Sequence, residues 1–466
     1  MTGALHGLAI NPALPTDLLD RFVMVAGPGI GQRLAERDDL SAAHVRVLAA
    51  GNEPWTLAAL ARRGLVTTAD VDPGDPEVVL ALADAGAAAH AWLRSPAQDG
   101  TARVRERLAE AAGTPVEILR ALAGDADIDV VAAVGHAAHL PPDLAERLAT
   151  HPHLRVRHAV AGNPATPAPV LDALATGSLP PAGSCPGCDG NAYPPPGWHC
   201  AGAHEDGTTG VRQALAANPA MPPQAFGVDV DREHTFTRWA LAARVDLTEE
   251  AYRRLSVDPV PGVRSTLAAN PAIAADLLAA LAIDPDPEVR RQVAHHPHVA
   301  LEVLAQVVST TKIGATLLPR IAAATAGEVR CCAVVLRALV AERRDLPPDV
   351  VDRFTRDPDA KVVKAIAPHP GIPEERLRAM LARHGHQVAT RVARNPGCPP
   401  DLLREFLPLR RALRVIAAHP RADADTLDAC VRHSDEQTAH AAAANPSLPR
   451  DVMARLLDAY TARGTP

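Results

Sequence analysis

The chain has 466 residues, a net charge of −7 and a sequence pI of about 6.3, so its overall charge does not indicate a nucleic-acid-binding protein. Apolar residues make up 47% of the sequence but aromatic residues only 3%, which predicts a core built from Ala, Leu and Val. No stretch has the apolar length needed to span a bilayer, and residues 1–6 lack the features of a secretory signal, so we expect a cytoplasmic protein with reduced cysteines.

A phrase that recurs at a spacing of 26 residues dominates the sequence. In most copies a register residue, usually Val and often followed by Arg, stands seven residues before an Asn-Pro or His-Pro pair, as Val263 does before Asn270 and Val289 before His296. Self-similarity at this period is typical of a solenoid of small stacked units. The register residues are Val78, Val104, Val130, Val156, Val211, Thr237, Val263, Val289, Val362, Val388, Ala412 and Thr438.

Each copy predicts two short helices. The stretch 263–269 places its apolar side chains on one helical face. The Asn-Pro pair at 270–271 ends this helix, because the residue before a proline is pushed out of the helical region. A second proline, such as Pro400, then begins the next helix at a position where its missing N–H costs nothing. Neither helix is long enough to be stable alone, so stacking on neighbouring units must supply the core.

In chain order we expect five segments of one all-α solenoid. Val45 and Val329 fit the phrase but stand off its period, so insertions or degenerate units are expected near residues 5–44 and 300–360. The longer step before Val211 contains an insertion. The expected segments are the N-terminal repeats 1–176, a Gly/Pro-rich insertion 177–207, central repeats 208–308, an off-period segment 309–360 and C-terminal repeats 361–466.

The phrase Val-Arg-x-x-Val/Leu-Ala-x-Asn-Pro, followed by a proline-led Leu-Leu segment and an Asp-Pro-Asp link such as 284–286, resembles the leucine-rich repeat variant family. The resemblance covers most of the chain. It implies a right-handed α-solenoid in which α-helices alternate with short or 3₁₀ helices, without a substantial sheet, as a relative of HEAT-type solenoids. It also implies that an iron–sulfur centre is possible, since some members carry one on a cysteine cluster. It implies no shared enzymatic activity.

The insertion contains a group of residues that predicts metal binding. Cys185 and Cys188 form a Cys-x-x-Cys pair, and Cys200 and His204 follow as Cys-x-x-x-His. Three thiolates and an imidazole make the closed tetrahedral ligand set of structural zinc, with His199 as an alternative fourth ligand. The surrounding stretch is rich in Gly and Pro and cannot order itself by burying a core. We therefore expect metal binding to order it.

Other interpretations of this insertion stay open. The family resemblance favours an iron–sulfur cluster, although a cubane cluster usually takes four cysteines and only three are present. Three unligated thiols in a flexible loop are a simpler alternative. A redox-active pair of Cys185 and Cys188 is a further one, for which the sequence offers no thioredoxin-like context.

Two columns of polar residues recur with the repeat. An arginine follows many register residues and is predicted to pair with acids of the inter-unit links, such as Asp258, Asp284 and Asp286, rather than to form a basic stripe for phosphates. The column comprises Arg46, Arg105, Arg157, Arg212, Arg238, Arg264, Arg290 and Arg330. The second column accepts Asn or His, which predicts a hydrogen-bonding turn residue and not a metal ligand; it comprises Asn163, Asn218, Asn270, His296, His369, Asn395, His419 and Asn445.

These observations favour a monomeric protein-interaction scaffold with a structural zinc loop, whose partner is another protein or a peptide. Solenoids present long concave surfaces, and the sequence shows neither a nucleophile–base set nor a Gly-rich phosphate loop, so an enzyme is not expected. The alternatives are an iron–sulfur protein with a redox or sensing role and a HEAT-like nucleic-acid-binding or repair protein. The latter would need a basic, aromatic concave face, for which Trp239 beside Arg238 is the one suggestive pair.

Overall fold

The structure, a computed structural model, describes the chain except for residues 1, 68–69, 184–204, 228, 315 and 463–466. The described residues form α-helices, a few 3₁₀ helices and no strand, so the prediction of an all-α solenoid is confirmed. Among them, no helix combines the length and apolar character needed to cross a membrane.

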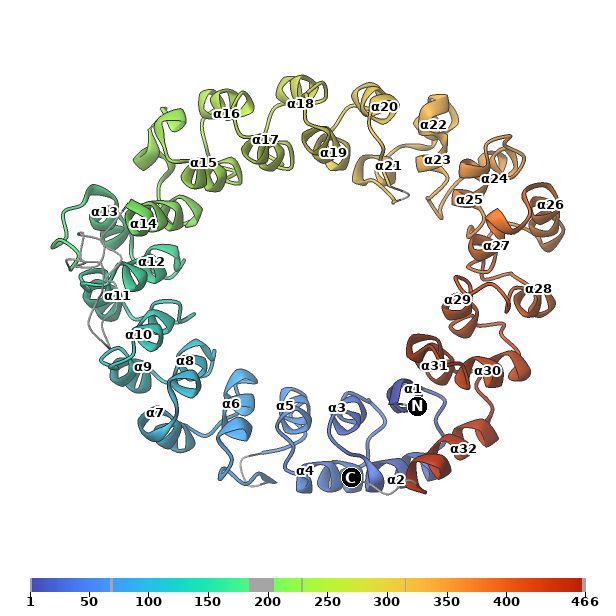
Figure 1. The fold of residues 1–466 in the computed structure, drawn as a ribbon, viewed down its shortest axis with the longest axis horizontal. Coiled ribbons are helices and arrows are strands. Elements are labelled where there is room, and N and C mark those ends of the chain that lie inside the picture. The colour runs from blue at the N-terminus through green and yellow to red at the C-terminus, as the bar shows by residue number, and fades with distance from the viewer. Residues whose placement is uncertain (1, 68–69, 184–204, 228, 315, 463–466) are drawn as a thin grey trace, which may run out of the picture. The chain divides into compact units, whose positions relative to one another are not determined.

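The chain divides into two compact units, each a curved double layer of helices (Figure 1). Unit 1 contains both ends of the chain, Met1–Val66 and Val308–Pro466, and unit 2 is Thr67–Val307. We call the helices on the concave side of each unit its inner row and the others its outer row. The helix α20 (Leu301–Thr310) crosses the division between the units.

Unit 2 alternates between the two rows along the chain. Its inner row consists of α6 (Pro76–Asp84), α8 (Ala102–Glu110), α10 (Ile128–Gly135), α12 (Leu154–Gly162), α14 (Glu205–Ala217), α15 (Thr235–Ala242), α17 (Pro261–Ala268) and α19 (Pro287–His295). Its outer row consists of η2 (His90–Leu93), α7 (Arg94–Asp99), α9 (Val116–Leu122), α11 (Pro142–Ala149), α13 (Ala168–Thr176), η3 (Pro223–Phe226), η4 (Val230–Arg232), α16 (Glu249–Ser256) and α18 (Ala275–Leu281). The second helix of most repeats is therefore a short α-helix, and a 3₁₀ helix takes its place in a few.

Unit 1 is built in the same way from the two ends of the chain. Its inner row consists of α21 (Pro319–Ala322), α23 (Arg337–Val340), α25 (Ala360–Ile366), α27 (His386–Val392), α29 (Leu413–Ala417), α31 (Glu436–Ala443), α1 (Thr2–Ala9), α3 (Ile30–Ala35) and α5 (Pro54–Arg62). Its outer row consists of α22 (Ala326–Arg330), η5 (Val334–Leu336), α24 (Pro348–Thr355), α26 (Glu374–His384), α28 (Pro400–Glu405), α30 (Ala424–Val431), α32 (Arg450–Thr461), α2 (Thr16–Val25) and α4 (Ala42–Ala50).

The helix α19 shows how the repeat phrase produces an inner helix. The Asp286 side chain accepts a hydrogen bond from the Glu288 N–H (2.7 Å), and Pro287 occupies the first turn, where no donor is needed. The register residue Val289 is fully buried. The helix ends before His296, which precedes a proline. Fixed positions within one 26-residue phrase thus determine where the helix begins, where it ends and which side chain it buries.

The register continues through the stretches where the 26-residue period breaks down in the sequence. Ala4, Ile30, Thr56 and Leu336 are buried, and each stands seven residues before a side chain that donates to carbonyl oxygens of the repeat it stacks on. These side chains are Asn11, Arg37, Arg63 and Arg343. Val45 and Val329 instead lie on the outer helices α4 and α22. Of the two alternatives, insertions or degenerate units, the described residues near 5–44 and 300–360 contain degenerate repeats.

The stacking also passes across the insertion. The Asn218 amide Nδ2 donates to the carbonyl oxygens of Ala161 (2.8 Å) and Asn163 (2.9 Å). The same two bonds join Asn270 to the repeat immediately before it in sequence. The helix α14 therefore packs on α12 as a consecutive repeat would, although the insertion lies between them in the sequence.

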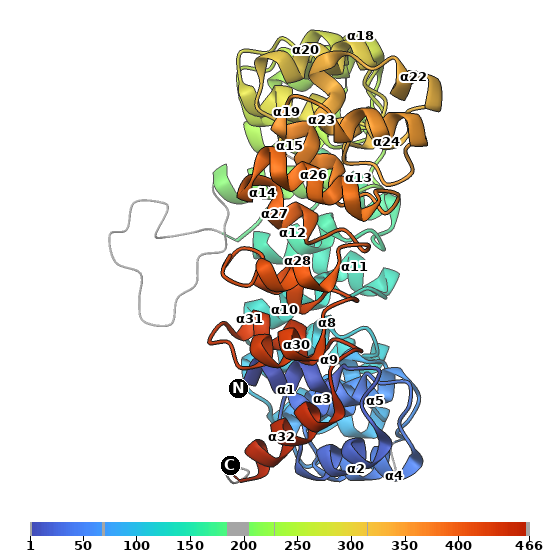
Figure 2. The ribbon, with the colours of Figure 1, turned by 90° about the vertical axis from the view of Figure 1, so that its right-hand side faces the viewer.

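In unit 1, the first repeat of the chain stacks on the last one, and α1 lies beside α31 (Figures 1 and 2). The Asn11 Nδ2 donates to the carbonyl oxygens of Ala443 (2.8 Å) and Asn445 (2.9 Å), which is the bond pattern of consecutive repeats. Gly3 and Gly7 allow the close approach, since an added Cβ would overlap the backbone oxygens of α31. The outer helices α2 and α32 add the ion pairs Arg21–Asp458 (2.6 Å) and Asp17–Arg450 (2.7 Å).

Candidate functional site

The predicted metal ligands lie outside the described residues. Cys185, Cys188, Cys200, His199 and His204 all fall within 184–204, so zinc binding by this insertion stays a prediction. In the rest of the chain, as far as the structure describes it, no three His, Cys, Asp or Glu side chains are grouped closely enough to hold a metal ion.

The described cysteines include two that serve in packing. Cys398 and Cys430 are buried, and burial raises the pKa of the Cys398 thiol to about 12 and that of the Cys430 thiol to about 11. Because the thiolate is the reactive species, neither thiol is a candidate nucleophile.

The Asn or His column forms a hydrogen-bond ladder between inner helices. We call its members ladder residues. In Asn270 the side-chain oxygen accepts from the Ala272 N–H (2.9 Å), while the amide nitrogen donates to carbonyl oxygens of Ala242 and Arg244 in the preceding repeat (2.8 and 2.5 Å). The predicted role in a hydrogen-bonded turn is confirmed, and in every member except His369 the same side chain also bonds to the preceding repeat of the stack.

Neutral histidine satisfies both requirements of this position. His296 accepts from the His298 N–H at Nδ1 (3.1 Å) and meets the Asn270 carbonyl oxygen at Nε2 (3.0 Å), so its Nε2 carries the proton. His419 repeats the arrangement against the Asn395 carbonyl oxygen (2.8 Å). Burial lowers the pKa of both imidazoles, which favours the neutral form that the ladder needs.

Arginine is a third residue type that fills the ladder position, and the sequence pattern of Asn or His before Pro does not indicate it. The Arg244 guanidinium donates to the carbonyl oxygens of Ala216 (3.2 Å) and Asn218 (2.9 Å), the atoms that an asparagine would reach. Arg37 and Arg63 do the same near the N-terminus, which is why the repeats there could not be found from Asn-Pro or His-Pro pairs.

The arginine column after the register residues is a structural ladder in several repeats, as predicted. Arg238 reaches Asp258 (2.5 Å) and Arg264 reaches Asp284 (2.7 Å), each in the link that leads to the next inner helix. The hydrogen bond from Arg105 lowers the pKa of the Asp125 carboxyl in the same arrangement. Arg212 pairs with Glu233, whereas Arg157 donates to backbone oxygens. Arg46 and Arg330 do not belong to this column, because they lie on the outer helices α4 and α22.

These ladders are internal, so the inner helices offer a binding surface on the side opposite their buried residues. In α17 the buried residues are Val263, Leu267 and Ala268, and the opposite side contains residues 262, 265, 266 and 269. We call these four positions, and their equivalents in other repeats, the inner face. Its composition differs between the two units.

In unit 2 the inner face carries two exposed aromatic side chains. Phe236 and Trp239 lie three residues apart on α15 and are 52% and 43% exposed. The Trp239 ring rests against Gly262 of α17, where an added Cβ would come within 2.6 Å of the indole. The His234 ring lies 5.5 Å from that of Phe236, centroid to centroid. We call His234, Phe236, Trp239 and Gly262 the aromatic patch.

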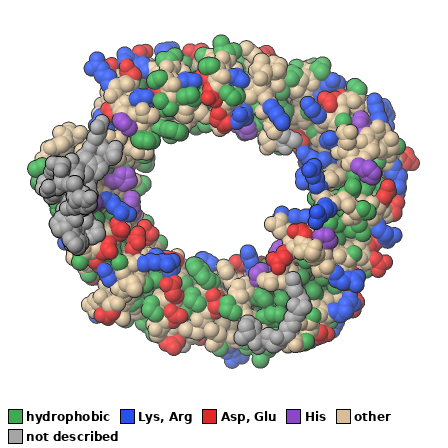
Figure 3. Space-filling view, in the orientation of Figure 1, with side chains coloured by type: hydrophobic (Ala, Val, Ile, Leu, Met, Phe, Trp, Pro, Cys, Tyr) green, Lys and Arg blue, Asp and Glu red, His purple; other side chains and the backbone are tan. Residues whose placement is uncertain are grey.

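In unit 1 the inner face is basic over α25, α27 and α29. Figure 3 shows Lys and Arg side chains gathered on the inner side of this unit, beside α27 and α29. Two of the three lysines of the chain, Lys361 and Lys364, belong to the neighbouring helix α25.

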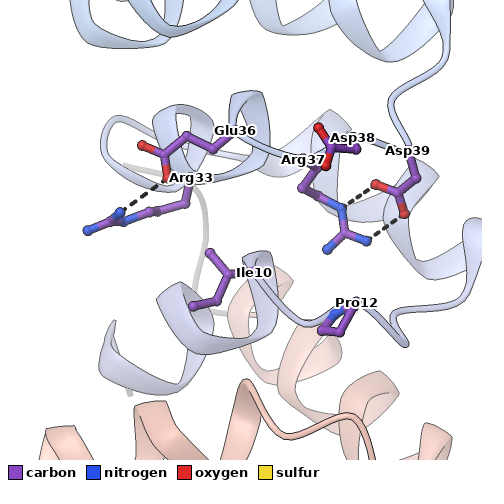
Figure 4. Close-up of a pocket in the computed structure, with 7 residues that line it drawn as sticks. All are labelled: Ile10, Pro12, Arg33, Glu36, Arg37, Asp38 and Asp39. Carbon is purple, nitrogen blue, oxygen red and sulfur yellow. Dashed lines mark hydrogen bonds and ion pairs between the residues drawn. The ribbon is translucent and has the colours of Figure 1, made fainter. Parts of the chain in front are cut away.

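A cavity of about 440 Å³ in unit 1 is a weaker candidate (Figure 4). It is lined by Ile10, Pro12, Arg33, Glu36, Arg37, Asp38 and Asp39. Each charged group there already has a partner: Arg33 meets Glu36, Arg37 meets Asp39, and Asp38 meets Arg63. The cavity therefore offers no uncompensated charge for a ligand.

Comparisons with known proteins assign no family. No protein-family model matches the chain, and no curated protein matches it. Among solved structures, a leucine-rich repeat variant with a novel repetitive motif is 21% identical, covering 57% of this chain and 86% of its own, with a TM-score of 0.24. An engineered protein is 14% identical (92% and 98% covered, TM-score 0.14), and Kap121p bound to Nup53p is 12% identical (98% and 51% covered, TM-score 0.19). TM-scores this low support no argument about function.

Proposed function

We propose that this protein is an interaction scaffold that binds a segment of another protein on the aromatic patch of unit 2. The observation that carries the proposal is the exposure of Phe236 and Trp239 on one inner helix of a chain with only 3% aromatic residues. Tryptophan is enriched among the few residues that carry most of the binding energy of protein interfaces, and exposed apolar patches mark interaction sites.

The surroundings of the patch favour a protein segment over a nucleic acid. The inner face of α17 contributes small residues, Ser265 and Thr266, and that of α19 contributes Arg291, which pairs with Glu288. A surface of neutral and paired groups supplies none of the phosphate contacts on which nucleic-acid affinity depends. An apolar side chain of a partner, inserted between the Phe236 and Trp239 rings, would fit this composition.

Selection of peptides from a displayed random library on the purified full-length protein tests the proposal. We expect the double variant Phe236→Ser/Trp239→Ser to weaken the selected peptides by about thirtyfold, since anchors of this kind contribute about 2 kcal/mol. The matched control is Val257→Ser/Ile283→Ser, which removes two exposed apolar side chains at the ends of outer helices. Equal binding to both double variants, or no selected peptide, would contradict the proposal.

We further propose that the insertion holds one structural zinc ion through Cys185, Cys188, Cys200 and His204, with His199 as the alternative fourth ligand. The ligand chemistry of the sequence supports this proposal. Zinc would supply a fixed centre for a segment whose sequence is rich in Gly and Pro. Because Asn218 bonds directly to the repeat before the insertion, the helices on either side do not depend on the insertion for their stacking.

Replacement of one ligand tests the zinc proposal. We expect Cys185→Ser to lose its zinc, measured by plasma mass spectrometry of the purified protein, while the helical circular-dichroism signal stays unchanged. Cys331→Ser, at an exposed cysteine after α22, is the control and should keep its zinc. Loss of most of the helical signal in Cys185→Ser would show that the metal belongs to the core. If the anaerobically purified protein instead contains iron and sulfide and absorbs visible light, the zinc proposal is wrong and the insertion holds an iron–sulfur cluster.

A further inference from the structure

The inner face of unit 1 concentrates positive charge over three consecutive helices. On α25, α27, α29 and their flanking turns, this face has twelve positions, of which six are basic and none is acidic. We call these six residues the basic face: Lys361, Lys364, Arg391, Arg394, Arg411 and Arg414. This local excess stands against a net charge of −7 for the whole chain.

Most of the basic face lacks a charged partner. Within the described chain, Lys361, Lys364, Arg394 and Arg411 form no ion pair, and Arg414 donates to the neutral Gln437 amide (2.7 Å). Arg391 alone lies near a carboxylate, that of Glu342, at 3.4 Å.

The outer row of the same repeats is different, because most of its arginines are paired with acids, although Arg353 and Arg383 donate only to backbone oxygens. Arg376 meets Asp352 (3.1 Å), Arg378 meets Asp401 (2.7 Å) and Arg404 meets Asp423 (2.5 Å). Acids therefore pair with most outer-row arginines of these repeats but with only one residue of the basic face, Arg391. A requirement for solubility alone would not separate the two rows in this way.

Burial and the excess of positive charge both lower the pKa of a neighbouring arginine, Arg344. Burial lowers the pKa of Arg344, and the nearby Arg391 and Arg394 lower it further, against the opposite effect of Glu342. Cations packed this closely repel one another, and an anionic ligand would relieve that repulsion.

We propose that the basic face binds an acidic segment of a partner protein in extended conformation. Neighbouring packed helices lie about 8–10 Å apart, and three residues of extended chain span about 10 Å. Acidic side chains at every third residue therefore match successive inner helices. This proposal concerns unit 1 and does not depend on the aromatic patch of unit 2.

A protein segment fits the surface better than a nucleic acid does. The twelve positions include no aromatic side chain, so single-stranded bases would find no stacking surface. A duplex extends beyond three helices and would meet the rest of a chain with negative net charge. A short acidic segment is confined to the basic face.

Fluorescence anisotropy with a labelled peptide tests this proposal on the full-length protein. The probe has Glu at every third position, and a peptide with Gln in place of Glu is the negative probe. We expect the triple variant Arg394→Gln/Arg411→Gln/Arg414→Gln to bind the Glu peptide about tenfold more weakly, since each exposed charge pair contributes several tenths of a kcal/mol. Added salt should weaken binding of the Glu peptide to the wild-type protein.

The matched control is Arg378→Gln/Arg404→Gln/Arg432→Gln on outer helices, which changes the net charge by the same amount. It should bind the Glu peptide as the wild type does. The proposal is overturned if both triple variants weaken binding equally, if the Gln peptide binds as well as the Glu peptide, if neither peptide binds, or if duplex DNA binds more tightly than the Glu peptide at the same ionic strength. The peptide-selection experiment on the aromatic patch uses other probes and variants, so its failure would not contradict this proposal.

Discussion

Gly7→Val is expected to detach the first repeat of the chain from the last. A Cβ at this position would overlap the carbonyl oxygen of His440, and backbone atoms cannot move aside as a flexible side chain can. Overpacking of this kind costs about 3 kcal/mol, and separation of the helices also removes the two hydrogen bonds of Asn11. Hydrogen exchange measured by mass spectrometry should show amides of α1 and α31 exchanging about a hundredfold faster than in the wild type.

Gly327→Val provides the control for helix propensity. Gly327 lies in α22, and an added Cβ there would meet only Thr325 Oγ1, at 4.0 Å. This variant should leave exchange in α1 and α31 unchanged. If Gly7→Val also leaves it unchanged, the close approach of the first and last repeats is not what holds α1 in place.

Most of the architecture could be predicted because the repeat phrase specifies its own helix boundaries. The register residue, the capping acid, the proline of the first turn and the Asn or His before the next proline all lie at fixed positions, as in α19. The first repeats escaped detection because Arg37 and Arg63 occupy ladder positions. A long guanidinium reaches the same carbonyl oxygens as an asparagine amide, so the geometry is kept while the recognisable Asn-Pro pair disappears.

The candidate surfaces were less predictable. The sequence predicted a metal site at Cys185 and its neighbours, which lie outside the described residues. It also indicated Trp239 as a possible binding residue, and this side chain does lie exposed on the inner face. The basic face was not predicted, because Arg394 and Arg411 stand at different positions of their repeats and form no column in the sequence. Which arginines have partners depends on the acids of neighbouring repeats, and this requires the three-dimensional stacking.

The packing of the first repeat of unit 1 against the last could not be predicted either. Asn11 has a ladder residue's sequence context, but its acceptors, Ala443 and Asn445, lie at the opposite end of the chain. No local pattern specifies a contact at such a sequence separation. The Gly3 and Gly7 pair is the one signal in the sequence, and its meaning depends on knowing which helix packs against α1.

Asn395→Ala is expected to destabilise unit 1 by about 2–4 kcal/mol. The Asn395 side chain is fully buried, donates to the carbonyl oxygens of Ala367 and His369 (2.7 Å each) and accepts from the Gly397 N–H (2.8 Å). Alanine leaves these three backbone groups without their partner, and each buried unsatisfied group costs about 1–3 kcal/mol before relaxation. Urea unfolding at pH 7.5, followed by circular dichroism, measures the loss.

Asn395→His tests whether the stability depends on the hydrogen bonds of this position or on the size and shape of the asparagine side chain. Neutral histidine accepts and donates in this position, as His419 does, so we expect this variant to lose only about 1 kcal/mol at pH 7.5. Burial lowers the pKa of ladder histidines below the value of about 6.5 in the unfolded chain. Their stabilisation is therefore present above that value and is lost as the pH falls below it, because the unfolded state then binds more protons. Between pH 7.5 and 5.5, Asn395→His should lose more stability than the wild type does, whereas Asn395→Ala should show the wild-type pH dependence. If the histidine variant is as unstable as the alanine variant at pH 7.5, the ladder position requires the asparagine amide itself and not any neutral side chain that both donates and accepts.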